Sequence, residues 1–181
     1  MRGRGDGLIR HVAVVGLMGS GKTTVGSRLA VFLGWPLRDS DVEIEASQGR
    51  TVRQLRDELG VDAMHELEAR QLLDALADPG PSVVCPAASV ADGDACLAAL
   101  RGRGVFVVLL MATPAVAARR FLSGQHRPWY GAEPAGFLAR QAAVRYPRIR
   151  ALDPLEVATD ERTPDEIVRL IAAKLASQAD Q

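Results

Sequence analysis

The residues with the clearest chemical potential lie in the stretch VVGLMGSGKTTVG, which runs from Val14 to Gly26. The segment from Gly16 to Thr23 fills the pattern G-x-x-x-x-G-K-[ST] at every fixed position. Glycines let backbone N–H groups curve around phosphate oxygens, and a following helix turns the positive end of its dipole toward the same anions. We therefore predict a loop that binds a nucleoside triphosphate through Gly16, Met18, Gly19, Ser20, Gly21, Lys22, Thr23 and Thr24.

Four side chains in and near this loop have the chemistry of phosphoryl transfer. The Lys22 ammonium can neutralise the β- and γ-phosphates, and the Thr23 hydroxyl can bind Mg²⁺. Asp39 and Asp41 lie in the stretch LRDSDVEIE, just after a predicted strand, and parallel α/β sheets place such residues beside the phosphate loop. Asp39 can hold Mg²⁺ through water, while Asp41 can orient an attacking hydroxyl and accept its proton. The alternative for this region is a solvated turn with a helix cap at Ser40 or Asp41.

Short apolar runs alternate with helical patterns, and these elements must position the chemistry. Strands are expected at 11–16, 36–39, 82–85, 105–111 and 155–159. Helices are expected at 22–33, 62–77 and 113–122 and from 163 onward. This alternation predicts an α/β fold of the P-loop type, a three-layer sandwich in which helices cover both faces of a five-stranded parallel sheet.

Capping residues and apolar spacing define the helices further. The first helix should end before Gly34, and the last should use Thr163 as its cap, Pro164 in its first turn and Glu166 to complete a capping box. The predicted core-facing side chains are Val25, Leu29, Phe32 and Leu33, then Ala69, Leu72, Leu73 and Leu76, and finally Ile167, Val168, Ile171 and Leu175.

Length and composition limit the class of protein. The 181 residues suit a single domain, 1–181, with a flexible tail at 1–9, and the aperiodic segment SGQHRPWYGAEPAG at 123–136 is predicted to form a mobile lid. Lys+Arg and Asp+Glu number 22 each, which argues against broad binding to nucleic acid or anionic membranes. No apolar run approaches the ~18 residues of a membrane-spanning helix. The two cysteines, Cys85 and Cys96, suit the core of a protein in a reducing compartment, so we expect a cytoplasmic protein. We also expect a monomer.

Beyond these features, the sequence resembles the shikimate kinases, which are small P-loop enzymes related to nucleoside monophosphate kinases. The resemblance rests on GLMGSGKTTVGSRLA, DSDVEIEASQGRTV, RRFLSGQHRP and TDERTP, and it extends from about His11 to Leu175. It implies ATP as phosphate donor, with Mg²⁺, and a small hydroxylated metabolite as acceptor. It also implies that Arg127 reaches the transferring phosphoryl group as the lid closes, that Arg120 covers the nucleotide, and that Arg162 and Pro164 border the adenine.

The acceptor side departs from the family pattern. Shikimate kinases hold the acceptor with the arginine of a phenylalanine–arginine pair, a three-glycine turn after the third strand, and an arginine four residues before a late tyrosine. Here these places hold Met64–His65, Pro86-Ala87-Ala88, and Ala142 before Tyr146. A mostly neutral histidine cannot make a bidentate pair with a carboxylate, and proline lacks an N–H donor.

These departures lead us to expect an acceptor other than shikimate, such as a neutral sugar or cyclitol. The residues predicted to bind it are Asp41, His65, Ala87, Ala88 and Arg140. The His65 imidazole could bind a substrate hydroxyl, or Glu68 could satisfy it within a partly buried pair.

Several alternatives remain open at this point. Trp129 and Tyr130 could wall the acceptor or merely pack within the lid. An authentic shikimate kinase could use Arg140 or Arg145 for the carboxylate. A non-catalytic ATP-binding protein and a nucleoside monophosphate kinase are the other candidates.

Overall fold

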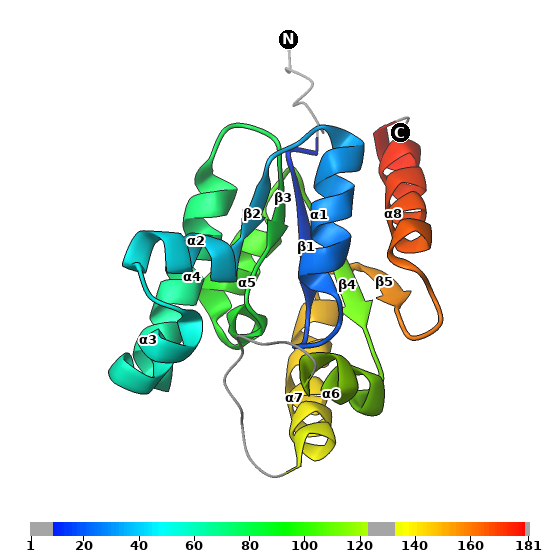
Figure 1. Cartoon of the computed structure of the whole chain (residues 1–181). Coiled ribbons are helices and arrows are strands. Elements are labelled where there is room, and N and C mark those ends of the chain that lie inside the picture. The colour runs from blue at the N-terminus through cyan, green and yellow to red at the C-terminus, as the bar shows by residue number, and fades with distance from the viewer. Residues whose placement is uncertain (1–8, 123–132, 180–181) are drawn as a thin grey trace.

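A five-stranded parallel sheet forms the centre of the molecule (Figure 1). The computed structural model describes residues 9–122 and 133–179. The strand order is β2-β3-β1-β4-β5, so β1 is the central strand. The strands are β1 (His11–Gly16), β2 (Leu37–Asp39), β3 (Ser82–Cys85), β4 (Val105–Met111) and β5 (Leu155–Ala158). The predicted parallel sheet and its five strands are confirmed, and all strands end at the same edge.

Helices cover both faces of this sheet. They are α1 (Lys22–Leu33), α2 (Ser40–Gln48), α3 (Val52–Leu59), α4 (Val61–Ala77), α5 (Asp94–Leu100), α6 (Pro114–Leu122), α7 (Pro134–Arg150) and α8 (Pro164–Ala179), with a 3₁₀ helix, η1 (Ala88–Asp92). One face packs against α1 and α8 through a core that includes Val12, Val14, Leu29 and Ile171. The other face packs against α4, η1, α5 and α7 through a core that includes Ala13, Val15, Leu72, Leu100 and Ile149. Three layers result, as the sequence predicted.

The predicted helix ends are also present. Gly34 caps α1 with a left-handed φ of 66°, a conformation that glycine adopts without strain. At α8, the backbone N–H of Thr163 donates to the Glu166 carboxylate at 2.7 Å, and the Glu166 N–H donates to the Thr163 hydroxyl at 3.3 Å. This reciprocal pair is the predicted capping box.

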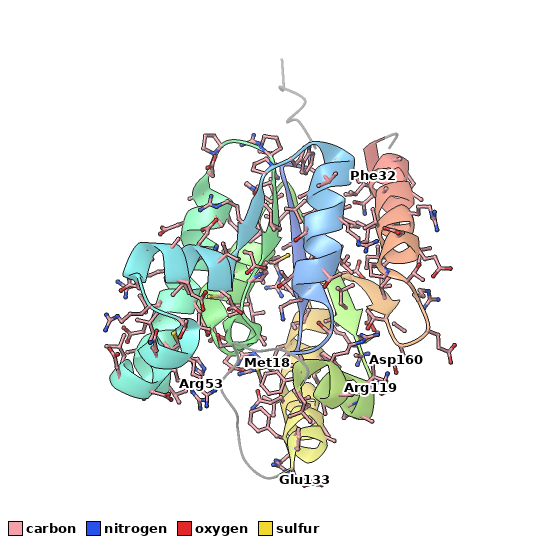
Figure 2. All side chains as sticks on the ribbon, in the orientation of Figure 1. Met18, Phe32, Arg53, Arg119, Glu133 and Asp160 are labelled. Atoms are coloured by element: carbon pink, nitrogen blue, oxygen red, sulfur yellow. The ribbon has the colours of Figure 1, made fainter. Side chains whose placement is uncertain are left out.

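Two side chains assigned to the core are exposed instead. Phe32 is 59% exposed and Leu73 is 37% exposed, whereas Leu29 and Leu72 are fully buried. A helix in an outer layer covers the sheet with only one stripe, and both exposed residues lie beside that stripe rather than on it. Figure 2 shows Phe32 at the end of α1 that is remote from the phosphate loop.

The sequence pattern did not specify the short helices that surround the site. Asp39, rather than Ser40 or Asp41, caps α2, and its side chain accepts the N–H groups of Asp41 and Val42. Helix α7 begins at Pro134, so the last three residues of the predicted lid (123–136) are helical. Proline suits this position because its fixed φ matches the first helical turn. Residues 123–132 of the predicted lid lie outside the described residues.

Candidate active site

The phosphate loop joins β1 to α1, and its shape requires glycine. Gly19 and Gly21 have φ values of 76° and 96°, in the left-handed region. A Cβ atom on Gly19 would lie 2.2 Å from the carbonyl oxygen of Ala117, which belongs to α6. This close approach keeps the loop tight against the neighbouring element, so the loop geometry follows from the glycine pattern.

Several polar groups of the loop are arranged to meet an anion. The Lys22 Nζ donates to the carbonyl oxygens of Gly16 and Leu17 at 3.0 and 3.2 Å, which folds the ammonium back over the loop. The Ser20 hydroxyl is buried and has no hydrogen-bond partner among the described residues. Gly21 caps α1 and, as a glycine, offers no side chain to the N-terminal N–H groups of the helix, which are the groups that a phosphate would use. The loop therefore fits the phosphates of ATP.

The two residues predicted to hold Mg²⁺ lie side by side. The Thr23 hydroxyl donates to Oδ2 of Asp39 at 2.9 Å. Asp39 is only 5% exposed, and its Oδ1 accepts the N–H of Asp41 at 3.2 Å. Within the described part of the chain no three His, Cys, Asp or Glu side chains converge on a cation site. A hydroxyl and one carboxylate fit Mg²⁺, which keeps several waters and takes other oxygens from a phosphate.

A pocket of about 310 Å³ opens beside this pair, between the phosphate loop and the helices α2, α3, α4 and α7. It brings together most of the side chains that the sequence singled out, namely Met18, Lys22, Thr23, Asp39, Asp41, His65, Ala87 and Ala88. Figure 2 places Met18 at this edge of the sheet. The pocket also contains Arg145, which the sequence offered only as an alternative to Arg140, and four residues that were not predicted to bind the acceptor, namely Arg56, Glu68, Ser89 and Gln141.

His65 lines the pocket in a neutral setting. Burial, followed by the positive charge of Arg145, lowers its pKa below the usual value, so the imidazole is neutral at pH 7. The suggested pair between His65 and Glu68 is not formed in the described structure. The Glu68 carboxylate instead accepts a short hydrogen bond from the Ser89 hydroxyl, because η1 lies against α4 at this point.

The prediction for Arg140 is not matched by its position. Arg140 is exposed and does not line the pocket, whereas Gln141 and Arg145 do. Residues four apart share a helix face, while the residue before Gln141 is rotated by about 100°. The predicted acceptor-binding residue, Arg140, is thus one position before Gln141, the residue of α7 that lines the pocket.

Two arginines line this pocket, whereas the sequence departures at His65 and Ala142 had led us to expect no positively charged group there. Arg145 is 8% exposed, and its guanidinium forms a fork with Asp92: Nε donates to Oδ1 at 2.9 Å and Nη2 donates to Oδ2 at 2.5 Å. Arg56 enters from α3. The Thr51–Gln54 capping box starts α3, and the motif T-x-x-Q was a signal in the sequence that could have revealed this helix.

The residues that the resemblance assigned to the nucleotide lie around the end of β5. Arg120 donates from Nη1 to the Thr159 hydroxyl and from Nη2 to the Thr159 carbonyl oxygen, both at 2.9 Å. Arg162 is exposed and donates to the Ala158 carbonyl oxygen, and Pro164 is the first residue of α8. The predictions for Arg127, Trp129 and Tyr130 fall at 123–132, outside the described residues.

Comparisons with known proteins agree with this site. A family model described as shikimate kinase matches residues 18–176. A shikimate kinase from Thermobifida fusca is 37% identical over 172 residues, which cover 94% of this chain and 98% of the relative. A solved shikimate kinase from Acinetobacter baumannii, in complex with shikimate, superposes with a TM-score of 0.86 at 26% identity over 94% of each chain. A gluconokinase from Sinorhizobium meliloti shares the fold. It superposes with a TM-score of 0.66 at 23% identity, over 96% of this chain and 95% of that one.

The sheet order, the phosphate loop and the adjoining pocket define a P-loop phosphotransferase that acts on an alcohol group. Such an enzyme takes its phosphoryl group from ATP. The chain belongs to the shikimate kinase family. None of the helices within 9–122 and 133–179 has both the length and the apolar character needed to cross a lipid bilayer.

Proposed function

We propose that this protein is an ATP- and Mg²⁺-dependent kinase whose phosphate acceptor is shikimate. Lys22 would neutralise the donor phosphates, and Thr23 and Asp39 would hold the metal ion. Asp41, on the same pocket wall, would orient the attacking hydroxyl and accept its proton. Mg²⁺, when bound, supplies positive charge to the phosphoryl oxygens. Arg127 is proposed to add a second charge there on the strength of the resemblance alone.

One observation supports shikimate above other acceptors: two arginines, Arg56 from α3 and Arg145 from α7, line the pocket. The Asp92 fork uses Nε and one N–H of Nη2, so the edge of Arg145 that carries Nη1 can still donate. Arg56 lies on another wall of the same pocket. A carboxylate between these cations would form charge-assisted hydrogen bonds, which are stronger than neutral ones. Arg56 of α3 and Arg145 of α7 would thus bind the carboxylate, which the neutral His65 cannot pair with.

A neutral cyclitol is the second candidate acceptor, and a specific observation favours it. Asp92 already neutralises Arg145, and His65 is neutral, which lowers the gain from binding an anion. A polyhydroxylated ring without a carboxylate would need only hydroxyl-binding groups.

A coupled assay of ADP release separates these candidates. We expect turnover with shikimate and little with myo-inositol. Arg145→Gln should raise the KM for shikimate about 10-fold or more, since a hydrogen bond to a charged group contributes roughly 1.5–3 kcal/mol. The matched control is Arg140→Gln, five residues earlier on the exposed face of α7, which should leave KM unchanged.

A second pair of variants tests the arginine that α3 contributes to the pocket. Arg56→Gln should raise the KM for shikimate, whereas Arg53→Gln, which is exposed one turn earlier in the same helix and does not line the pocket, should not. Turnover of myo-inositol with none of shikimate would refute the proposal. ATP binding without turnover of either compound would indicate a non-catalytic protein, and phosphorylation of AMP, CMP or UMP would indicate a nucleoside monophosphate kinase.

A further inference from the structure

Three polar side chains form a network beside the corner where β2 leads into α2. Nε of Arg38, in β2, donates to Oε1 of Glu43, in α2, and Nη2 of Arg38 donates to Oε2 of Glu43 at 3.1 Å. Nε2 of Gln71, in α4, donates to the same Oε2 at 3.0 Å. None of the three is among the described residues that line the acceptor pocket. The network can therefore affect the site only through the residues that it holds in place.

The fork between Arg38 and Glu43 encloses the two aspartates of the proposed site. Asp39 accepts the Thr23 hydroxyl at 2.9 Å, and Asp41 lines the pocket. Both lie between positions 38 and 43, so the fork closes a short stretch of chain around them. The strand before them has little other support, because β2 is three residues long, lies at the edge of the sheet and pairs with β3 alone. The fork thus fixes the angle between this strand and the helix that follows it.

Gln71 connects the corner to α4, the helix that also supplies Met64 and His65 to the pocket. Gln71 is only 8% exposed, and its Oε1 has no hydrogen-bond partner in the described part of the chain. A buried carbonyl without a partner costs free energy, and a leucine of similar size would avoid that cost. Stability alone therefore does not explain a glutamine here, whereas a hydrogen bond that fixes α2 against α4 does.

The charges of the network favour a fixed geometry. Burial acts to raise the pKa of Glu43, but the hydrogen bonds from Arg38 and Gln71 and the charge of Arg38 outweigh it and hold the pKa below its usual value. Glu43 is therefore ionised at neutral pH. Two parallel hydrogen bonds between a guanidinium and a carboxylate fix the plane of both groups, so the fork is suited to orienting the chain that joins them.

We propose that this network positions the β2–α2 corner against α4, so that Asp39 reaches Mg²⁺ and Asp41 faces the attacking hydroxyl. Arg38, Glu43 and Gln71 are then positioning residues, because none of them touches the reacting groups. The inference rests on the roles proposed above for the two aspartates and deepens them. A network that served stability alone would leave the chemistry unchanged when it was broken in a folded protein.

Glu43→Gln tests the proposal, because it keeps the size of the side chain and removes the charge that the fork needs. In the coupled assay with shikimate we expect kcat to fall about 10-fold or more, since small misplacements of reacting groups strongly reduce the rate. The KM for shikimate should change less than about 2-fold, because the arginines proposed to bind its carboxylate come from α3 and α7. A rise in KM with unchanged kcat would overturn the inference.

A second measurement needs no acceptor. Calorimetry gives the affinity for ATP in the presence of Mg²⁺ and in the presence of EDTA, and the ratio of the two is the contribution of the metal ion. We expect this ratio to shrink at least ~3-fold in Glu43→Gln, because a displaced Asp39 would hold Mg²⁺ less well.

Glu156→Gln is the matched control, because Glu156 forms the same kind of fork with Arg150. Nε and Nη2 of Arg150 each donate to one carboxylate oxygen at 2.9 Å. The Glu156 side chain is 36% exposed and that of Glu43 is 30% exposed. The Arg150 fork joins α7 to β5 and encloses no residue that lines the pocket. We expect the control to keep the wild-type kcat and the wild-type effect of Mg²⁺.

Urea unfolding checks that each variant is folded. Gln71→Leu becomes the decisive variant if Glu43→Gln does not fold; it should be at least as stable as the wild type and should still lower kcat about 3-fold. Unchanged kcat and an unchanged effect of Mg²⁺ in the folded variant would overturn the inference, and so would equal losses in the Glu156→Gln control. Absence of wild-type turnover with shikimate would instead overturn the proposed acceptor, while the calorimetric ratio would still decide the inference.

Discussion

Replacing Asp92 by asparagine tests how the acceptor pocket orients its buried arginine. The fork between Asp92 and Arg145 joins the end of η1 to α7 and fixes the plane of the guanidinium. Asparagine keeps the size of the side chain but removes its charge and can accept only one of the two hydrogen bonds. We therefore expect Arg145 to lose its fixed orientation while the helices around it stay in place.

The size of the effect follows from the burial of the two partners. The Arg145 side chain is 10% exposed and that of Asp92 is 40% exposed. Breaking a fully buried pair costs about 3–5 kcal/mol, whereas exposed pairs contribute at most about 1 kcal/mol. For this half-buried pair we expect a loss of roughly 1–2 kcal/mol in the free energy of unfolding. The KM for shikimate should rise about 10-fold with little change in kcat, as expected when binding is lost equally in the ground and transition states.

Steady-state kinetics and urea unfolding of Asp92→Asn provide the measurements. Asp94→Asn is the control, because Asp94 at the start of α5 pairs with Arg148 of α7, but its side chain is 96% exposed and lies outside the pocket. That variant should match the wild type in KM and nearly match it in stability. A lower KM in Asp92→Asn would refute the reasoning, because it would mean that Asp92 competes with the acceptor for Arg145.

Three further predictions concern the packing, the pH dependence and the donor site. Gly26→Ala should lower the free energy of unfolding by about 1–3 kcal/mol, because the new Cβ would lie 2.1 Å from the Sγ of Cys85. In urea unfolding, the double variant with Cys85→Ala should recover part of this loss. A double variant as unstable as Gly26→Ala alone would show that the contact with Cys85 is not the cause. Burial lowers the pKa of His11 in the folded protein below its usual 6.5, so at acidic pH the unfolded chain binds more protons at this residue than the folded protein does. The free energy of unfolding should therefore fall as the pH drops below about 6.5, by at most ~1.4 kcal/mol per pH unit. His11→Gln should therefore flatten the dependence of Tm on pH between about 7.5 and 5.5, and an unchanged slope would be the contrary result. Lys22→Ala should reduce kcat at least ~100-fold without unfolding the protein, whereas retained turnover would show that this loop is not the donor site.

The donor half of the site follows from contiguous sequence. The phosphate loop and the cap of α1 depend on glycine conformations and on residues that are neighbours along the chain. The contact between Thr23 and Asp39 was also predictable, because the carboxyl ends of parallel strands meet at one edge of the sheet. Backbone geometry alone thus places these groups together.

The acceptor half was predicted less well. The sequence identified His65 and Asp41, but it favoured Arg140 over Arg145 and gave no reason to expect Arg56 in the pocket. A shift of one residue along α7 changes which side chain faces inward by about 100°. Sequence periodicity locates helix boundaries only to within a few residues, so it could not decide between these neighbours.

The sequence by itself determined the parallel sheet, its layers of helices and the phosphate loop, because each depends on local backbone preferences and on apolar periodicity. Only the tertiary structure decided which side chains form the acceptor pocket. Its walls come from α3, α4, η1 and α7, and the fork between Arg145 and Asp92 joins residues 53 positions apart. Such contacts depend on how the helices are rotated against the sheet, and that rotation is fixed by the packing of the whole core rather than by any single segment.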